Sequence, residues 1–245
     1  MKLSNHSGRY RATLLLVLFL FIFPKNTYAM HISEGFLSPA WSALWYICAF
    51  PFVAYGLVFI RRDIANEPRK KLYMGIVGGF VFVLSALKLP SVTGSCSHLT
   101  GTGLGVILLG PWAMPVVGFI ALLFQALLLA HGGVTTLGAN VFSMAVAGPM
   151  LAYGVFFFCK KLRVNSSLSV FLVAFVADLF TYIVTSLQLA LAYPDGAGGV
   201  ASSFVKFASM FAVAQLPLAV VEGVITVYAY KLITRGEMAT SFNLM

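Results

Sequence analysis

The residues best suited to chemistry stand at the start of the predicted mature chain. Cleavage after Ala29 would leave a chain that begins with Met30 and His31, so that a free amine lies one residue ahead of an imidazole. The amine, the deprotonated backbone nitrogen of His31 and its imidazole could then close two fused rings around one divalent ion. Nitrogen ligands suit cobalt, nickel and copper, whereas magnesium and calcium prefer oxygen. The competing interpretation is a chance histidine at position two, which the dipeptide alone does not exclude.

A second imidazole, that of His98, stands in a loop of Gly, Ser and Thr residues between two apolar segments. Glycine lets the backbone bend sharply, as a loop that folds into the mouth of a helix bundle requires. We therefore predict that His98 supplies a fourth nitrogen ligand. Cys96 in the same loop is a candidate soft ligand, although a lone thiol is more often a buried apolar residue. The glycines from Gly101 to Gly105 lack the spacing of a nucleotide fingerprint, and no strand is predicted before them.

Other polar residues in or beside apolar segments have two open interpretations. His131 could donate a hydrogen bond that orients the metal site or bind the ion transiently on entry, and a purely structural role is equally open. Ionisable and polar groups within a membrane are costly, so each is either functional or engaged with a neighbouring helix or subunit. No sequence pattern indicates that any two of these groups meet. They are Gln125, Asn140, Asp178, Lys206 and Glu222.

The elements that must position these residues are predicted to be membrane-spanning helices. Of 245 residues, 60% are hydrophobic and 9% are charged, which is typical of a membrane protein. We predict an all-α, polytopic membrane helix bundle of six to seven transmembrane helices, formed by one domain over residues 30–245. The apolar segments run from about 40 to 60, 72 to 89, 104 to 130, 136 to 159, 168 to 192 and 204 to 232.

Residues 1–29 have the pattern of a secretory signal peptide. Basic residues precede an apolar run over 12–23. The small residues Thr27 and Ala29 stand at the two positions that a signal peptidase recognises. The alternative is a first transmembrane helix that stays attached, but a run of about 12 residues is short for a span.

Basic residues predict the orientation of the spans. Clusters around Arg61 to Lys71, Lys160 to Arg163 and Lys231 to Arg235 are expected to lie in the cytoplasm. All three share one side only if the segment 104–130 crosses twice or re-enters, turning back at the prolines and glycine of 110–115. In that arrangement the mature N-terminus and all three remaining histidines face outward, and the C-terminus is cytoplasmic.

Several functional classes are disfavoured. The net charge is +9, and the basic residues stand in short clusters between apolar spans. The expected surroundings are therefore membrane lipid rather than nucleic acid. The chain lacks a phosphate loop, a serine nucleophile elbow and an HExxH motif, so an enzyme is not expected. Two alternatives stay open, a membrane scaffold subunit without a ligand and a small-molecule permease, which would more naturally show paired broken helices.

Three blocks of this sequence resemble the family of cobalt transport proteins CbiM of energy-coupling factor transporters. They are the start at 30–35, the loop from Gly94 to Gly105 and the block from Gln125 to Ala139. The resemblance extends from Met30 to about Leu232, whereas residues 236–245 look like an unrelated tail.

The resemblance implies a function and a set of partners. It implies a substrate-binding membrane subunit for cobalt(II) in the bacterial inner membrane, with metal ligands at Met30, His31 and His98 and with His131 and Cys96 as possible support. It also implies a CbiQ-like coupling subunit, a CbiO-like ATPase and a CbiN-like small membrane subunit, with ATP bound only by a partner and cobalt delivered to cobalamin biosynthesis. Nickel(II) uptake is the alternative, because related proteins have a very similar mature start and a four-nitrogen site suits Ni(II).

Overall fold

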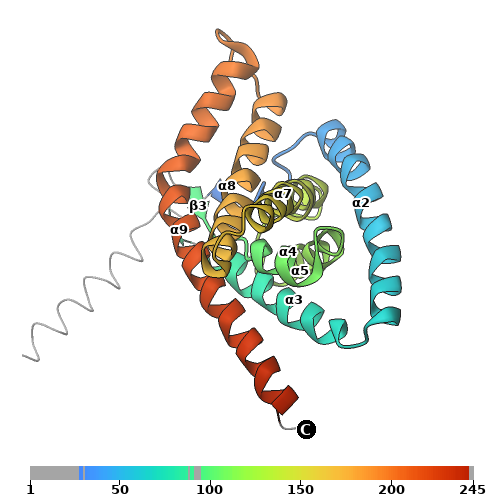
Figure 1. Ribbon diagram of the computed structural model, residues 1–245. Coiled ribbons are helices and arrows are strands. Elements are labelled where there is room, and N and C mark those ends of the chain that lie inside the picture. The colour runs from blue at the N-terminus through green and yellow to red at the C-terminus, as the bar shows by residue number, and fades with distance from the viewer. Residues whose placement is uncertain (1–27, 30, 88, 91–94, 243–245) are drawn as a thin grey trace, which may run out of the picture.

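The computed structural model describes residues 28, 29, 31–87, 89, 90 and 95–242, most of them in helices (Figure 1). Of the signal peptide predicted over residues 1–29, residues 1–27 lie outside the described residues, and so does the predicted new terminus Met30. The helices are α2 (Pro39–Asn66), α3 (Lys70–Ala86), α4 (Thr102–Leu109), α5 (Met114–Leu129), α6 (Leu137–Val141), the π-helix η1 (Phe142–Ala147), α7 (Gly148–Lys161), α8 (Ser166–Ala192) and α9 (Gly199–Phe242).

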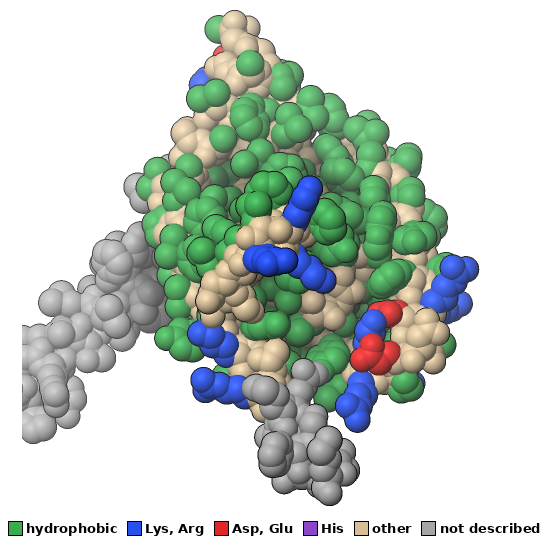
Figure 2. Space-filling view, in the orientation of Figure 1, with side chains coloured by type: hydrophobic (Ala, Val, Ile, Leu, Met, Phe, Trp, Pro, Cys, Tyr) green, Lys and Arg blue, Asp and Glu red, His purple; other side chains and the backbone are tan. Residues whose placement is uncertain are grey.

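Four helices in the described part of the chain are long and apolar enough to cross a membrane, which confirms the prediction of a polytopic helix bundle. These four are α2, α8, the continuous stretch Leu137–Lys161 and the part of α9 up to Arg235. Helix α5 is also apolar but shorter. Large apolar side chains such as Ile47 and Phe50 are about 70% exposed, and apolar side chains cover much of the face in Figure 2. Such a surface suits lipid, while the backbone polar groups are satisfied within the helices.

The predicted reversal within 104–130 is confirmed. Helix α4 ends at Leu109 and α5 begins at Met114, and Gly110 between them has a φ of +79°, a conformation that favours glycine. His98 precedes α4 and His131 follows α5, yet their ring centroids are 5.2 Å apart, so the two helices run in opposite directions. At eight residues α4 is roughly 12 Å long, too short to cross alone.

A small sheet, which the sequence did not predict, lies directly before His98. Its strands β1 (Tyr28–Ala29), β2 (Leu89–Pro90) and β3 (Ser95–Ser97) follow the order β1-β3-β2. Strand β1 runs parallel to β3 with Ala29 opposite Cys96, and β2 runs antiparallel to β3. Residues just before the predicted cleavage point therefore pair with the strand that leads into the His98 loop.

The basic clusters lie at helix ends that point away from the histidines. Helix α2 starts a few residues after His31 and ends beyond Arg61, and α7 follows η1 and ends with Lys160 and Lys161. In Figure 2 the Lys and Arg side chains gather on the front and lower part of the molecule, around the ends of α2, α7 and α9. Their placement fits the predicted topology, and the assignment of this end to the cytoplasm stays a prediction.

Candidate metal site

Three histidines that are far apart in the sequence meet inside the bundle. His31, His98 and His131 are each at most 3% exposed, and one ring nitrogen from each lies within 4.8 Å of the others. The rings of His31 and His98 stack at 4.3 Å between centroids, and the ring of His131 meets that of His31 edge-on at 4.5 Å. Opposite nitrogens on one transition-metal ion are about 4 Å apart, so the nitrogens of this cluster are close to the spacing that a single ion requires.

The backbone next to His31 is held by the segment that leads into α6 and by α6 itself. The Asn140 side chain accepts a hydrogen bond from the Ile32 N–H at 2.9 Å and donates one to the Ile32 carbonyl at 3.1 Å. The Thr136 hydroxyl donates a further hydrogen bond to the same carbonyl at 2.5 Å. Asn140 thus pairs with Ile32 much as a neighbouring strand would, and this pairing fixes the position of His31.

A close backbone approach brings the residues just after His31 against the loop after α5. A Cβ at Gly133 would lie 2.4 Å from the Cα of Glu34, so only glycine fits there. The Glu34 carboxylate accepts hydrogen bonds from the backbone N–H of Thr135, and the hydrogen bonding of Thr135 lowers the pKa of Glu34 from its ordinary value. The Gly35 N–H in turn donates to the Thr135 hydroxyl at 3.1 Å.

The end of α5 turns His131 into the site. Ala130 adopts a left-handed conformation with a φ of 45°, and the His131 N–H donates to the Gln125 carbonyl at 3.1 Å. The His131 Nε2 then lies 3.2 Å from the His31 Nδ1. A hydrogen bond to an imidazole fixes its tautomer and ring plane, and the role of His131 in orienting the site stays a prediction.

Helices α8 and α9 hold the loop that carries His98. The Tyr182 hydroxyl donates to the His98 carbonyl at 2.7 Å and lies 3.3 Å from its Nδ1. The Gln215 side chain donates to the same carbonyl at 3.1 Å. Two residues later, the backbone N–H of Thr100 donates to the Glu222 carboxylate at 2.5 Å.

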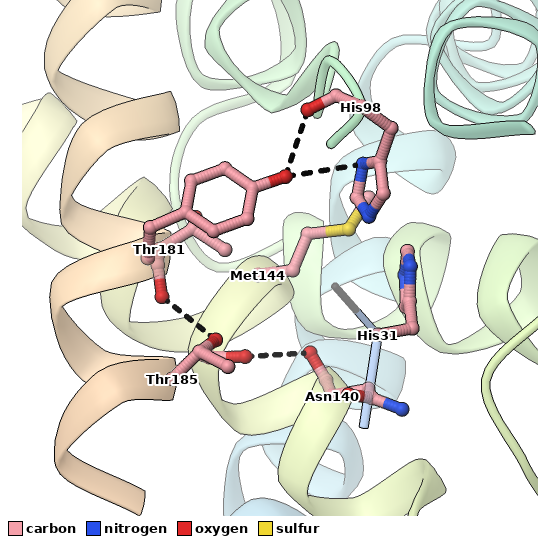
Figure 3. Close-up of a pocket in the computed structure, with 8 residues that line it drawn as sticks. His31, His98, Asn140, Met144, Thr181 and Thr185 are labelled. Atoms are coloured by element: carbon pink, nitrogen blue, oxygen red, sulfur yellow. Dashed lines mark hydrogen bonds between the residues drawn. The ribbon is translucent and has the colours of Figure 1, made fainter. Parts of the chain in front are cut away.

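A cavity of about 10 Å³ lies beside His31 and His98 (Figure 3). Its volume is enough for about one water molecule or a bare ion. Met144 extends its sulfur toward His98, which adds a soft thioether to the imidazoles at this point. The remaining lining is mostly polar: Asn140, Ser143, Thr181, Tyr182 and Thr185.

The sequence did not indicate that any two of the polar residues within apolar segments meet, but two of them do. Asp178 on α8 and Glu222 on α9 are fully buried and interact electrostatically with each other, and the Gln215 side chain donates to Asp178 at 2.5 Å. Neither pairing has a sequence signal, because the partners are on different helices. Met144, Tyr182 and Gln215 were missed for the same reason.

Two other polar residues have structural partners away from the cluster. The Gln125 side chain donates to the Phe82 carbonyl and the Ser85 hydroxyl. Lys206 is mostly exposed and pairs with Asp195, and the hydrogen bond from Lys206 lowers the pKa of Asp195 to about 2.

Two of the predicted metal-site residues cannot be placed by their side chains. Met30 lies outside the described residues, and of Cys96 the structure describes only the backbone, which pairs within the sheet. His31, His98 and His131 are therefore the predicted residues that the structure brings together.

The fold and the site define a multi-pass helical membrane protein with a buried cluster of nitrogen donors. The chain belongs to the CbiM family, since the family described as "CbiM: Cobalt uptake substrate-specific transmembrane region" matches residues 31–239.

Named relatives match over most of their length. The chain is 56% identical over 221 residues to the cobalt transport protein CbiM of Acetoanaerobium sticklandii, covering 90% of this chain and 91% of the relative. It is 58% identical over 214 residues to that of Thermosediminibacter oceani, covering 87% and 88%.

Two solved structures share the fold. A crystal structure of a truncated transition metal transporter matches with a TM-score of 0.71 and 26% identity over 84% of this chain and 99% of that one. A crystal structure of a transition metal transporter matches with a TM-score of 0.73 and 26% identity over 85% and 94%.

Proposed function

We propose that this protein is the substrate-binding membrane subunit of a cobalt(II) uptake transporter. The observation that carries the proposal is the buried cluster of His31, His98 and His131, whose nitrogens are close enough to approach one ion. Imidazole favours cobalt and nickel over magnesium and calcium, so such a site selects against the abundant hard cations. Membership in a cobalt uptake family supports cobalt as the substrate.

The proposed ligands are the Met30 amine, the backbone and imidazole nitrogens of His31, and the His98 imidazole. His131 orients His31 through the contact at 3.2 Å and is available to bind an entering ion. The ion enters from the outer face, the loop that carries His98 closes over it, and reorientation of the subunit releases it inward.

The energy for reorientation comes from a partner. The chain has no phosphate loop of its own, so a CbiO-like ATPase, a CbiQ-like coupling subunit and a CbiN-like small membrane subunit complete the proposed transporter. The protein then resides in the bacterial inner membrane with its mature N-terminus outside and its C-terminus in the cytoplasm. The imported cobalt serves cobalamin biosynthesis.

Nickel(II) is the second candidate substrate. A set of nitrogen donors suits Ni(II) as well as Co(II). The choice between them depends on how the protein constrains the coordination geometry, which the ligand types do not determine.

Metal titration of the purified mature protein tests the function. The protein, with its first residue established by intact mass, is titrated with Co(II) and separately with Ni(II) by calorimetry. Tight binding of one Co(II) per chain is expected. Tighter binding of Ni(II) would reassign the substrate to nickel, and binding of neither ion would favour the scaffold alternative.

Replacing Asn140 with aspartate is expected to weaken cobalt binding. Asn140→Asp keeps the acceptor for the Ile32 N–H but places a carboxylate oxygen against the Ile32 carbonyl, where the amide now donates. Because substitutions in residues that orient ligands typically reduce metal affinity about 10- to 100-fold, we expect a loss in that range by calorimetry.

The same substitution at Asn165 is the matched control. Asn165 caps α8 by accepting from the Ser167 N–H, and aspartate caps a helix equally well. Asn165→Asp should therefore bind cobalt like the unchanged protein. Equal affinity in Asn140→Asp would show that Asn140 does not position His31.

A further inference from the structure

Glu222 is an acidic residue buried in the middle of a membrane-spanning helix. Its side chain is 0% exposed on α9, where an ionisable group is costly unless it is paired. Replacing a buried charged network with well-packed apolar residues often leaves a protein equally stable. A contribution to stability therefore does not by itself explain why an acidic residue stands at this position. The partners of its carboxylate indicate a different role.

Both carboxylate oxygens of Glu222 bind the loop that carries His98. One oxygen accepts from the Thr100 backbone N–H at 2.5 Å, and the other accepts from the Thr100 hydroxyl at 2.8 Å and the Gly101 N–H at 2.9 Å. Gly101, the residue before α4, has a φ of +68°, a left-handed conformation that favours glycine. The carboxylate also lies at the amino end of α4, where the helix dipole favours negative charge.

Neighbours of Glu222 extend this anchor to His98 itself. Asp178, a neighbour of Glu222 in the bundle core, accepts from the Gln215 side chain, which also donates to the His98 carbonyl. The three loop contacts of Glu222 are all donors, an arrangement that suits an ionised carboxylate. Charge-assisted hydrogen bonds are roughly twice as strong as neutral ones, which makes this the firmest described attachment of the loop.

The two halves of the site are therefore attached to different parts of the bundle. Asn140 and Thr136 hold the backbone beside His31, whereas α8 and α9 hold the loop of His98. The distance between His31 and His98 therefore depends on the position of the His98 loop, held by α8 and α9, relative to the backbone beside His31, held by Asn140 and Thr136.

We propose that Glu222 is a positioning residue for metal capture, which holds the His98 loop where one ion can bind His31 and His98 together and so sets how long the ion is retained. This inference rests on the proposed function, because it assumes that the two imidazoles share an ion.

The test measures how fast cobalt leaves the purified mature protein. Co(II) is bound, an excess of chelator is added, and the dissociation rate is followed together with the visible absorption of bound Co(II), which reports coordination geometry. Glu222→Gln keeps the size of the side chain but turns an NH₂ group toward one of the loop donors. We expect dissociation about 10- to 100-fold faster and a changed Co(II) spectrum.

A second variant approaches the same contact from the loop. Thr100→Val removes the hydroxyl that donates to Glu222 at 2.8 Å and that also lies 3.1 Å from the Thr102 hydroxyl. It should also release cobalt faster, and its effect should not add to that of Glu222→Gln in the double variant, because both disrupt one contact. If Glu222→Gln does not fold, Thr100→Val decides alone.

Thr226→Val is the control, since Thr226 is 0% exposed one turn further along α9 and valine matches its shape. It should release cobalt at the rate of the unchanged protein. Dissociation rates and spectra in Glu222→Gln and Thr100→Val that equal those of this control would overturn the positioning role while leaving cobalt capture intact. Failure of the unchanged protein to bind Co(II) at all would overturn both proposals.

Discussion

Replacing His98 with alanine is expected to abolish tight cobalt binding while the protein stays folded in the membrane. The substitution removes the imidazole that stacks on His31 at 4.3 Å and leaves the ion with ligands from one side only. Since altering residues that merely support a ligand costs about 10- to 100-fold in affinity, loss of a ligand should cost at least about 100-fold. Calorimetric titration of the purified variant with Co(II) measures the loss.

The His98 loop should survive this substitution. Tyr182 and Gln215 donate to the His98 carbonyl rather than depending on its ring, and Glu222 accepts from the backbone of Thr100. These contacts remain in His98→Ala, so its elution profile in detergent and its amount in the membrane should match those of the unchanged protein.

Cys159→Ala is a suitable control, because Cys159 is also buried but lies near the basic end of α7. It should bind cobalt normally. Undiminished cobalt binding by His98→Ala would show that His98 is not a metal ligand and that its stacking on His31 serves only packing.

The residues of the site were more predictable than the network that supports them. The local sequence marks both histidines as candidate ligands, because His31 follows an expected new terminus and His98 stands in a glycine-rich loop. The reversal at Gly110 was also predictable, because prolines and glycine end helices through local backbone chemistry. These predictions depended on neighbouring residues and on the side of the membrane that each loop must face.

The contacts between helices had no such local signal. Thr100 and Glu222 are 122 residues apart, and Ile32 and Asn140 are 108 apart. Whether they meet depends on how each helix is rotated about its axis and shifted along it. Hydropathy does not define those two quantities for a helix that is apolar on all sides.

Two short elements near the site were unpredictable for a different reason. The strands around β3 are two or three residues long, too short to show an alternating pattern. The π-helix η1 changes the turn of the helix that carries Asn140 and Met144, and such stretches often occur at functional sites. Its residues are ordinary apolar and small ones, so composition does not mark it.

A chain that keeps its signal peptide is expected to lose cobalt capture. The predicted chelate needs a primary amine at Met30, and in the uncleaved chain that nitrogen is an amide N–H, whose delocalised lone pair is not available unless the amide first loses its proton, as the backbone nitrogen of His31 must already do. His31 is already fixed by its neighbour Ile32 through Asn140, so the uncleaved chain has little freedom to supply another ligand from the same place. We expect affinity for Co(II) to fall at least about 100-fold, as for loss of any ligand.

Cleavage of one purified sample separates the effect of the amine from that of folding. A specific protease site placed immediately before Met30, in a chain whose predicted cleavage is blocked by Ala29→Phe, lets the same protein be titrated with Co(II) before and after it is cut. Binding should appear only after cutting, when intact mass shows a chain that begins at Met30. Strand β1, which ends at Ala29, leaves with the removed peptide, so the cut also shows that its pairing with β3 is dispensable for capture. Equal cobalt affinity before and after cutting would refute the amine as a ligand and leave the imidazoles of His31, His98 and His131 as the donors in the described residues.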